Sequence, residues 1–120
     1  AWRKVSKSDT VQATLDYAVE NAASLMFPWD EPQSSATGIL DDITYDWLGV
    51  VKSLLLTKGK SIVVSEHHIL HAHEIVTGLG IDAEPTGSAS VAGVIAALES
   101  RSIRSEDRVG VLLTGRQHHS

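Results

Sequence analysis

Apolar and polar positions change period along this chain, and the second half shows the clearest alternation. Short apolar runs rich in β-branched residues predict strands, whereas apolar residues spaced three or four apart predict helices. From residue 61 onward the pattern predicts, in turn, strand 61–65, helix 66–77, strand 80–83, helix 86–98 and strand 109–114. Strands that alternate with helices are typical of an α/β fold, here a small, mostly parallel sheet with helices on both faces.

The first half predicts two helices joined by a loop. The first begins near Ser8 or Asp9 and ends at Pro28, with apolar residues three to four positions apart. These residues are Val11, Leu15, Ala18, Ala22 and Met26. The second helix begins at Asp41 or Asp42, and a buried stripe is expected along it. The stripe consists of Ile43, Trp47, Val51 and Leu54.

Composition narrows the class of protein without identifying it. The 120 residues are 42% hydrophobic and 21% charged, and no repeat or linker is visible, so we expect one domain over residues 1–120. The net charge of −5 argues against a nucleic-acid partner. No apolar run is long enough for a membrane span, and the absence of cysteine excludes disulfides and thiolate metal ligands. A cytoplasmic enzyme or binding domain fits this composition.

Two predicted strands end in polar turns that contain glycine, at residues 84–88 and 113–116. In a parallel sheet both turns lie at the carboxyl edge, where ligands bind, so we expect them side by side. Backbone amides at the start of helix 86–98 favour an anion, and the Thr114 hydroxyl can bond a ring nitrogen. Ordinary turn chemistry without a ligand is the alternative for both turns. Loop 33–38, rich in small residues, is either plain surface or lines a ligand.

Ser65 is expected to cap helix 66–77, which has one apolar and one polar face. The apolar face consists of Ile69, Ala72, Val76 and Leu79. The polar face carries His67, His71 and Glu74, residue types that can bind zinc at this spacing. The motif His-Glu-x-x-His is absent, so we expect a solvated polar face and no metal site. No G-x-S-x-G elbow, P-loop or G-x-G-x-x-G fingerprint occurs either.

Four stretches, taken in order, resemble a known family. They are S-S-A-T-G-I-L-D-D-I-T-Y-D-W from residue 34, I-V-V-S-E from 62, G-I-D-A-E-P-T-G-S-A-S-V-A-G from 80 and R-V-G-V-L-L-T-G from 108. Together they are similar to the carboxyl-terminal part of fold-type II pyridoxal-phosphate enzymes, most of all threonine synthases and threonine synthase-like relatives. Threonine dehydratases share the plan. The resemblance runs from about residue 27 to residue 115 and implies the tryptophan synthase β-like architecture.

The resemblance implies roles for residues beside the cofactor ring. A hydroxyl after the last strand bonds the pyridine nitrogen in the family, and here that residue is Thr114, with Gly115 letting the ring approach. A neutral hydroxyl does not hold that nitrogen protonated, which suits β-elimination and replacement chemistry. The other implied cofactor-binding residues are Glu84, Ala36, Thr37 and Gly38. The implied substrate is a small hydroxy-amino acid or its phosphate ester.

Two family features have no counterpart in this sequence: the Schiff-base lysine and the Gly/Asn-rich phosphate loop. The chain is therefore expected to be the carboxyl-terminal portion of a larger catalytic domain, inactive alone for want of the lysine. Its expected partner is the missing amino-terminal half or a second copy of the chain. The alternative is a non-catalytic α/β binding or interaction module that associates with a partner chain.

Overall fold

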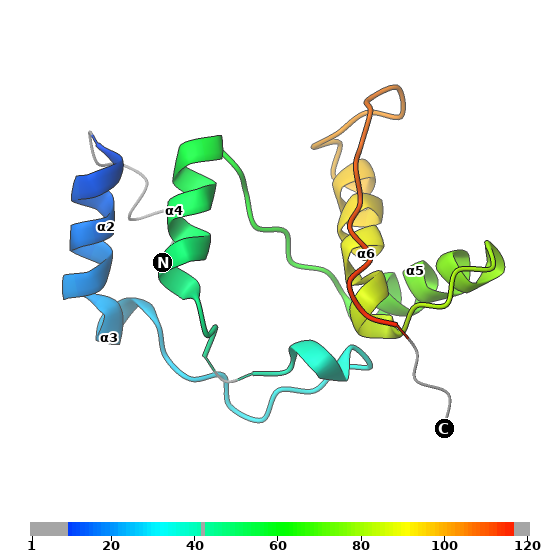
Figure 1. Ribbon diagram of the computed structural model, residues 1–120, viewed down its shortest axis with the longest axis horizontal. Helices are drawn as coiled ribbons and strands as arrows, with labels where there is room; N and C mark the ends of the chain where they lie inside the picture. Colours follow the sequence, from blue (N-terminus) through cyan, green and yellow to red (C-terminus); the bar gives the residue numbers. More distant parts are fainter. Residues whose placement is uncertain (1–9, 42, 117–120) are drawn as a thin grey trace. The chain divides into compact units, whose positions relative to one another are not determined.

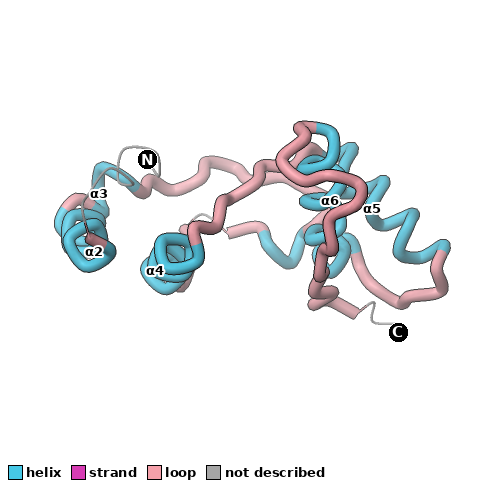
Figure 2. The backbone as a smooth tube through the Cα atoms, turned by 90° about the horizontal axis from the view of Figure 1, so that it is seen from above, coloured by secondary structure: helices cyan, strands magenta, loops and turns pink. Residues whose placement is uncertain are grey.

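The computed structural model describes residues 10–41 and 43–116, and over these residues the chain is helical (Figure 1). The helices are α2 (Val11–Glu20), α3 (Ala22–Leu25), the 3-10 turn η1 (Thr37–Ile39), α4 (Trp47–Thr57), α5 (Glu66–Gly78) and α6 (Pro85–Glu99). Long loops join them (Figure 2). None of these helices is long and apolar enough to cross a membrane.

The chain groups into two compact units. The first comprises residues 1–32 and 41–61, and the second comprises residues 33–40 and 62–120. The loop at 33–38 therefore belongs with α5 and α6, although the first unit's α4 separates it from them in the sequence. The prediction of one domain stays a prediction.

The first unit holds α2, α3 and α4. Thr10 caps α2 by accepting a hydrogen bond from the Ala13 amide, and Leu15 and Ala18 are buried as the helical spacing predicts. The predicted caps Ser8 and Asp9 lie outside the described residues.

The second predicted helix begins later than the sequence indicates. Asp42 lies outside the described residues, and α4 begins at Trp47 instead of directly after Asp41. The prediction of a buried stripe on this helix is wrong, because no α4 residue is buried and Ile43 is exposed ahead of the helix. Periodicity identified an apolar face without showing whether anything covers it.

The second unit is built on α5 and α6, which pack against each other, with α5 crossing behind the lower end of α6 in Figure 1. Its core contains Ala36, Ile69, Ala72 and Ala92, with Val64, Val91 and Ile95 packed against it. The alanines on facing positions let the two helices approach closely. His68 Nε2 lies 2.6 Å from Glu99 Oε2, which ties the first turn of α5 to the last turn of α6.

Both helix predictions for this unit are confirmed to within one residue. Ser65 caps α5 as expected and forms a capping box with His68. Ile69, Ala72 and Val76 are buried as predicted, whereas Leu79, the last member of the predicted face, follows the helix and is 72% exposed.

The predicted parallel sheet is wrong, and so is the tryptophan synthase β-like architecture expected with it. Among the described residues, the only β pairing is an isolated antiparallel bridge between Ala83 and Arg116. Residues 61–64 and 109–115 are irregular and join no ladder. A β-branched run favours extended backbone, but a strand also needs a neighbour about 4.8 Å away to accept its hydrogen bonds. The apolar runs from which these strands were predicted are largely exposed, with Val63 at 95% and Leu112 at 80%.

Candidate functional site

Three segments that are far apart in the sequence meet at the first turn of α6. The Glu84 amide donates to the Gly115 carbonyl at 3.3 Å, next to the bridge between Ala83 and Arg116. The Gly38 amide donates to the Thr86 hydroxyl at 2.9 Å. The turns at 84–88 and 113–116 therefore lie side by side without a sheet to hold them, and the small-residue loop contacts the first of them.

Close backbone approach at this point depends on two glycines. A Cβ added to Gly115 would lie 2.6 Å from Glu84 Oε1 and 3.0 Å from the Gly87 nitrogen. A Cβ added to Gly87 would lie 2.6 Å from the Gly115 nitrogen and would also collide with its carbonyl oxygen. The immediate neighbours of Gly115 are therefore the Glu84 side chain and the α6 backbone. Its predicted role beside a cofactor ring stays a prediction.

Thr114 presents a free hydroxyl next to this junction. Its side chain is exposed, and it makes no hydrogen bond to any other residue in the described ranges. A hydroxyl both donates and accepts, so this group fits either protonation state of a pyridine nitrogen. The Thr114 hydroxyl is therefore compatible with a pyridine nitrogen, and its predicted role beside a cofactor ring stays a prediction.

The loop residues that the resemblance singled out have different environments. Thr37 and Gly38 are exposed at the surface of η1. Ala36 has no accessible surface and packs against Ile69, Ala72 and Ala92. Its side chain anchors the loop in the core of the unit, so only the neighbouring residues present themselves to a ligand.

Glu66, which the sequence did not single out, holds the start of this loop. Its carboxylate accepts hydrogen bonds from the Ser34 hydroxyl at 2.8 Å, the Ser35 amide at 2.7 Å and the Ser35 hydroxyl. The Ser35 hydroxyl, then the Ser35 amide, then the Ser34 hydroxyl lower the pKa of Glu66 below its ordinary value. An acidic residue just after an N-cap signals helix stabilisation, and the partners are 31 and 32 residues away, so no local pattern reveals them.

The histidine face of α5 does not assemble a metal centre. The His67 and His71 rings stack with centroids 6.2 Å apart, and His71 Nδ1 lies 3.9 Å from Glu74 Oε2. Within residues 10–41 and 43–116, no group of three or more His, Asp or Glu residues is arranged to hold a metal ion. The zinc alternative therefore gains no support.

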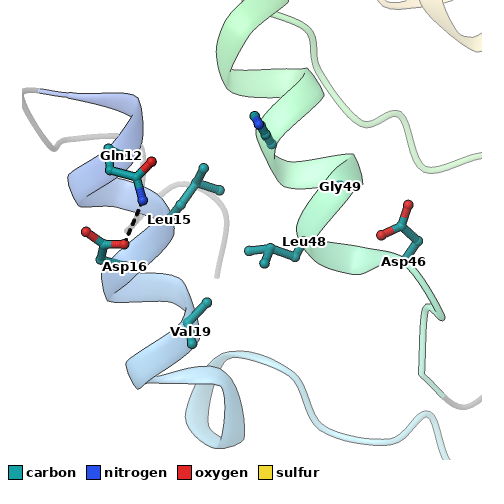
Figure 3. Close-up of a pocket in the computed structure, with 8 residues that line it drawn as sticks. Gln12, Leu15, Asp16, Val19, Asp46, Leu48 and Gly49 are labelled. Carbon is teal, nitrogen blue, oxygen red and sulfur yellow. Dashed lines mark hydrogen bonds between the residues drawn. The ribbon is translucent and has the colours of Figure 1, made fainter.

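A surface pocket in the first unit lies between α2 and α4 (Figure 3). Leu15 and Val19 point into it from α2 and Leu48 points into it from α4. Its other lining residues are Gln12, Asp16, Asp46, Gly49 and Lys52. None of the predicted site residues lines this pocket.

Comparison with known proteins identifies threonine synthases as relatives. The chain is 36% identical to the threonine synthase of Bacillus sp. (strain ULM1) over 87 residues, which is 72% of this chain and 25% of that protein. It is 27% identical over 110 residues to the threonine synthases of Mycobacterium bovis and Mycobacterium tuberculosis, covering 89% of this chain and 31% of theirs. No family model and no solved structure matches the chain. The chain thus has a threonine synthase-like relationship and spans about a quarter to a third of these relatives' length.

Proposed function

We propose that this chain is the carboxyl-terminal portion of a pyridoxal-phosphate-dependent, threonine synthase-like enzyme and lines one side of the cofactor ring. The substrate would be a small hydroxy-amino acid or its phosphate ester. The similarity to threonine synthases supports the reaction class. The lysine that binds the cofactor covalently would come from polypeptide outside these 120 residues.

One observation carries the proposal: the resemblance selects segments at 36–38, 84 and 114–115, and these segments meet at one end of α6. Consecutive segments are separated by 45 and 29 residues, so their meeting does not follow from sequence proximity. The meeting persists although the sheet expected to align them is absent from the described residues. A ligand that contacts all these segments would explain why they meet, whereas ordinary turn chemistry explains each turn only by itself.

Each residue at the junction has a distinct task in this proposal. When bound, pyridoxal phosphate supplies the electron sink for elimination and replacement chemistry. Thr114 orients the ring through its nitrogen and, because it is neutral, does not hold a proton there. Glu84 fills the space beside Gly115 and keeps the two turns together through its amide. Thr37 and Gly38 present small exposed surfaces that a flat ring can approach.

A chimera tests the proposal. This chain is grafted into the Bacillus threonine synthase in place of the stretch that it matches over 87 residues and the residues that flank that stretch. The purified chimera is examined for the absorbance of bound pyridoxal phosphate and for phosphate release from a hydroxy-amino acid phosphate ester. Thr114→Val removes the hydroxyl at nearly constant volume, and Thr114→Ser restores it. Thr77→Val is the matched control, because the Thr77 hydroxyl bonds only carbonyls of its own helix.

We expect the chimera to bind the cofactor, with an absorbance maximum that Thr114→Val shifts and that Thr114→Ser and Thr77→Val leave in place. Weaker cofactor binding in Thr114→Val alone also agrees with the proposal. A folded chimera without cofactor absorbance contradicts it. If neither Thr114→Val nor Thr77→Val changes the absorbance spectrum, the proposed contact between Thr114 and the cofactor ring is wrong.

The exposed apolar residues of the second unit support a further part of the proposal: other polypeptide of the same enzyme covers them. Val63, Leu112 and Leu79 are 95%, 80% and 72% exposed, which is costly for side chains of this type in water. We expect the isolated chain to self-associate through these residues. Light scattering at tens of micromolar tests this, and a monodisperse monomer contradicts it. Self-association that persists in the chimera favours the alternative of an interaction module.

A further inference from the structure

We propose that Glu66 is a positioning residue for this site: its carboxylate fixes the loop at 34–38 and thereby sets where Gly38 meets α6. The inference rests on the proposed function for what the loop serves. The contact itself does not depend on that function. The hydrogen bonds of Glu66 go to Ser34 and Ser35 and not to Gly38, Glu84 or Gly115, so the route we propose from Glu66 to the site is the loop.

The carboxylate grips two consecutive loop residues at once. Ser35 contributes its amide and its hydroxyl, and Ser34 contributes its hydroxyl. The Ser34 oxygen also accepts a hydrogen bond from the Ala36 amide at 3.1 Å, which extends the connection one residue further. Charged acceptors form stronger hydrogen bonds than neutral ones. The hydrogen bonds to the Glu66 carboxylate therefore restrain the loop more than hydrogen bonds among its own neutral groups would.

The far end of the same loop is held against α6. Ala36 is buried in the core, and the Gly38 amide donates to the Thr86 hydroxyl at 2.9 Å. Space at Gly38 is limited, since an added Cβ would lie 2.9 Å from the same oxygen and 3.1 Å from its neighbouring methyl carbon. Only two residues separate Ser35 from Gly38, so we expect movement at the Glu66 end to reach Gly38.

A carboxylate suits this position better than its nearest replacements. All the groups that face it are donors, and a carboxylate offers two accepting oxygens. Glu66→Gln keeps the size but turns an NH₂ group toward donors. Glu66→Asp keeps the charge at the start of α5, and with it the helix-dipole interaction, but shortens the reach. The pair therefore separates loop positioning from simple helix stabilisation.

The test is amide hydrogen exchange in the 120-residue chain without cofactor, read at single residues by mass spectrometry with electron-transfer fragmentation at low micromolar concentration, below the range in which we expect self-association. We expect Glu66→Gln to speed exchange at Ser35 and Gly38 roughly tenfold, relative to the wild type. Glu66→Asp should speed exchange at the same two amides. The control Glu74→Gln, on the exposed face of α5, should change neither, and the Val76 amide should keep its protection in all variants.

Three results would overturn the inference. The first is faster exchange at Ser35 with Gly38 unchanged, because the far end of the loop is then independent of Glu66. The second is wild-type exchange in Glu66→Asp, because helix stabilisation then explains the effect. If Glu66→Gln unfolds the unit, Ser35→Ala decides instead, since it removes one contact and leaves α5 intact. The third result that would overturn the inference is unchanged hydrogen exchange at Gly38 in Ser35→Ala.

A failure here can be told apart from failure of the proposed function. Exchange is measured without pyridoxal phosphate, so a chimera that binds no cofactor leaves this result standing. In a cofactor-binding chimera, we expect Glu66→Gln to weaken cofactor affinity and Glu74→Gln to leave it unchanged. Equal affinity in the two variants contradicts positioning by Glu66 without touching the assignment of the cofactor.

Discussion

Adding one methyl group at Gly87 should force apart the two turns that form the candidate site. Gly87 is buried in the first turn of α6 against the Gly115 backbone. The new Cβ in Gly87→Ala would lie 2.6 Å from the Gly115 nitrogen and 2.8 Å from its Cα, well inside contact distance. The obstacle is backbone, so no side-chain rotation relieves it. Gly93, in the same helix, has nothing within 4 Å of its added Cβ and provides the matched control.

The comparison isolates the steric cost. In a helix alanine is favoured over glycine by up to about 1 kcal/mol, and this gain largely cancels between the two variants. What remains is overpacking, which costs about 1–3 kcal/mol. We therefore expect Gly93→Ala to unfold at or above the denaturant midpoint of the wild type. The free energy of unfolding of Gly87→Ala should lie about 1–3 kcal/mol below that of Gly93→Ala.

If residues 114–116 moved away in Gly87→Ala, the overpacking cost would be smaller, but two contacts of the wild type would be lost. The Glu84 amide would lose its acceptor on Gly115, and the contact between Arg116 and Asp82, 3.3 Å in the wild type, would open. Chemical denaturation measures the overpacking cost, and hydrogen exchange at the Glu84 amide detects movement of the turn. If Gly87→Ala matches Gly93→Ala in unfolding free energy and also in exchange at Glu84, the close approach of the two turns is refuted.

Two further predictions concern the polar contacts of α5. The pKa of Glu66 is lowered on folding from an ordinary value of 4.5, so its grip on Ser35 is complete above that value and is lost as the pH falls through the folded-state pKa. The protection factor of the Ser35 amide should fall in acid accordingly; a fall that persists in Glu66→Gln would contradict this. A double-mutant cycle with His68→Ala and Glu99→Ala should give a coupling energy of about 0.5–1 kcal/mol by denaturant unfolding. Additive single effects would show that their 2.6 Å contact does not brace α5 against α6.

Local pattern was sufficient where an element's ends and buried face depend on nearby residues. Ser65 caps α5 by accepting a hydrogen bond from the His68 amide, three residues away. The start of that helix is therefore determined by a few neighbouring residues. α6 begins at Pro85, a residue suited to the first turn, and lies within one residue of its predicted bounds. The structure brings Gly38 to Thr86 and Glu84 to Gly115, in segments that the resemblance singled out, and the role of these residues beside a cofactor stays a prediction.

Strand pairing, burial and long-range hydrogen bonds were decided by tertiary contacts, because each depends on residues from elsewhere in the chain. The β-branched run at 61–64 and the apolar run at 109–113 indicated extended backbone, but their pairing depended on neighbours that the described residues do not supply. The apolar stripe of α4 was visible in the sequence, but the incomplete burial of Trp47, Val51 and Leu54 was not. The hold of Glu66 on Ser35 spans 31 residues and follows no period. Helical hydrogen bonds and caps join near neighbours and leave a signature in the sequence, whereas burial and long-range contacts exist only once the folded chain brings distant segments together.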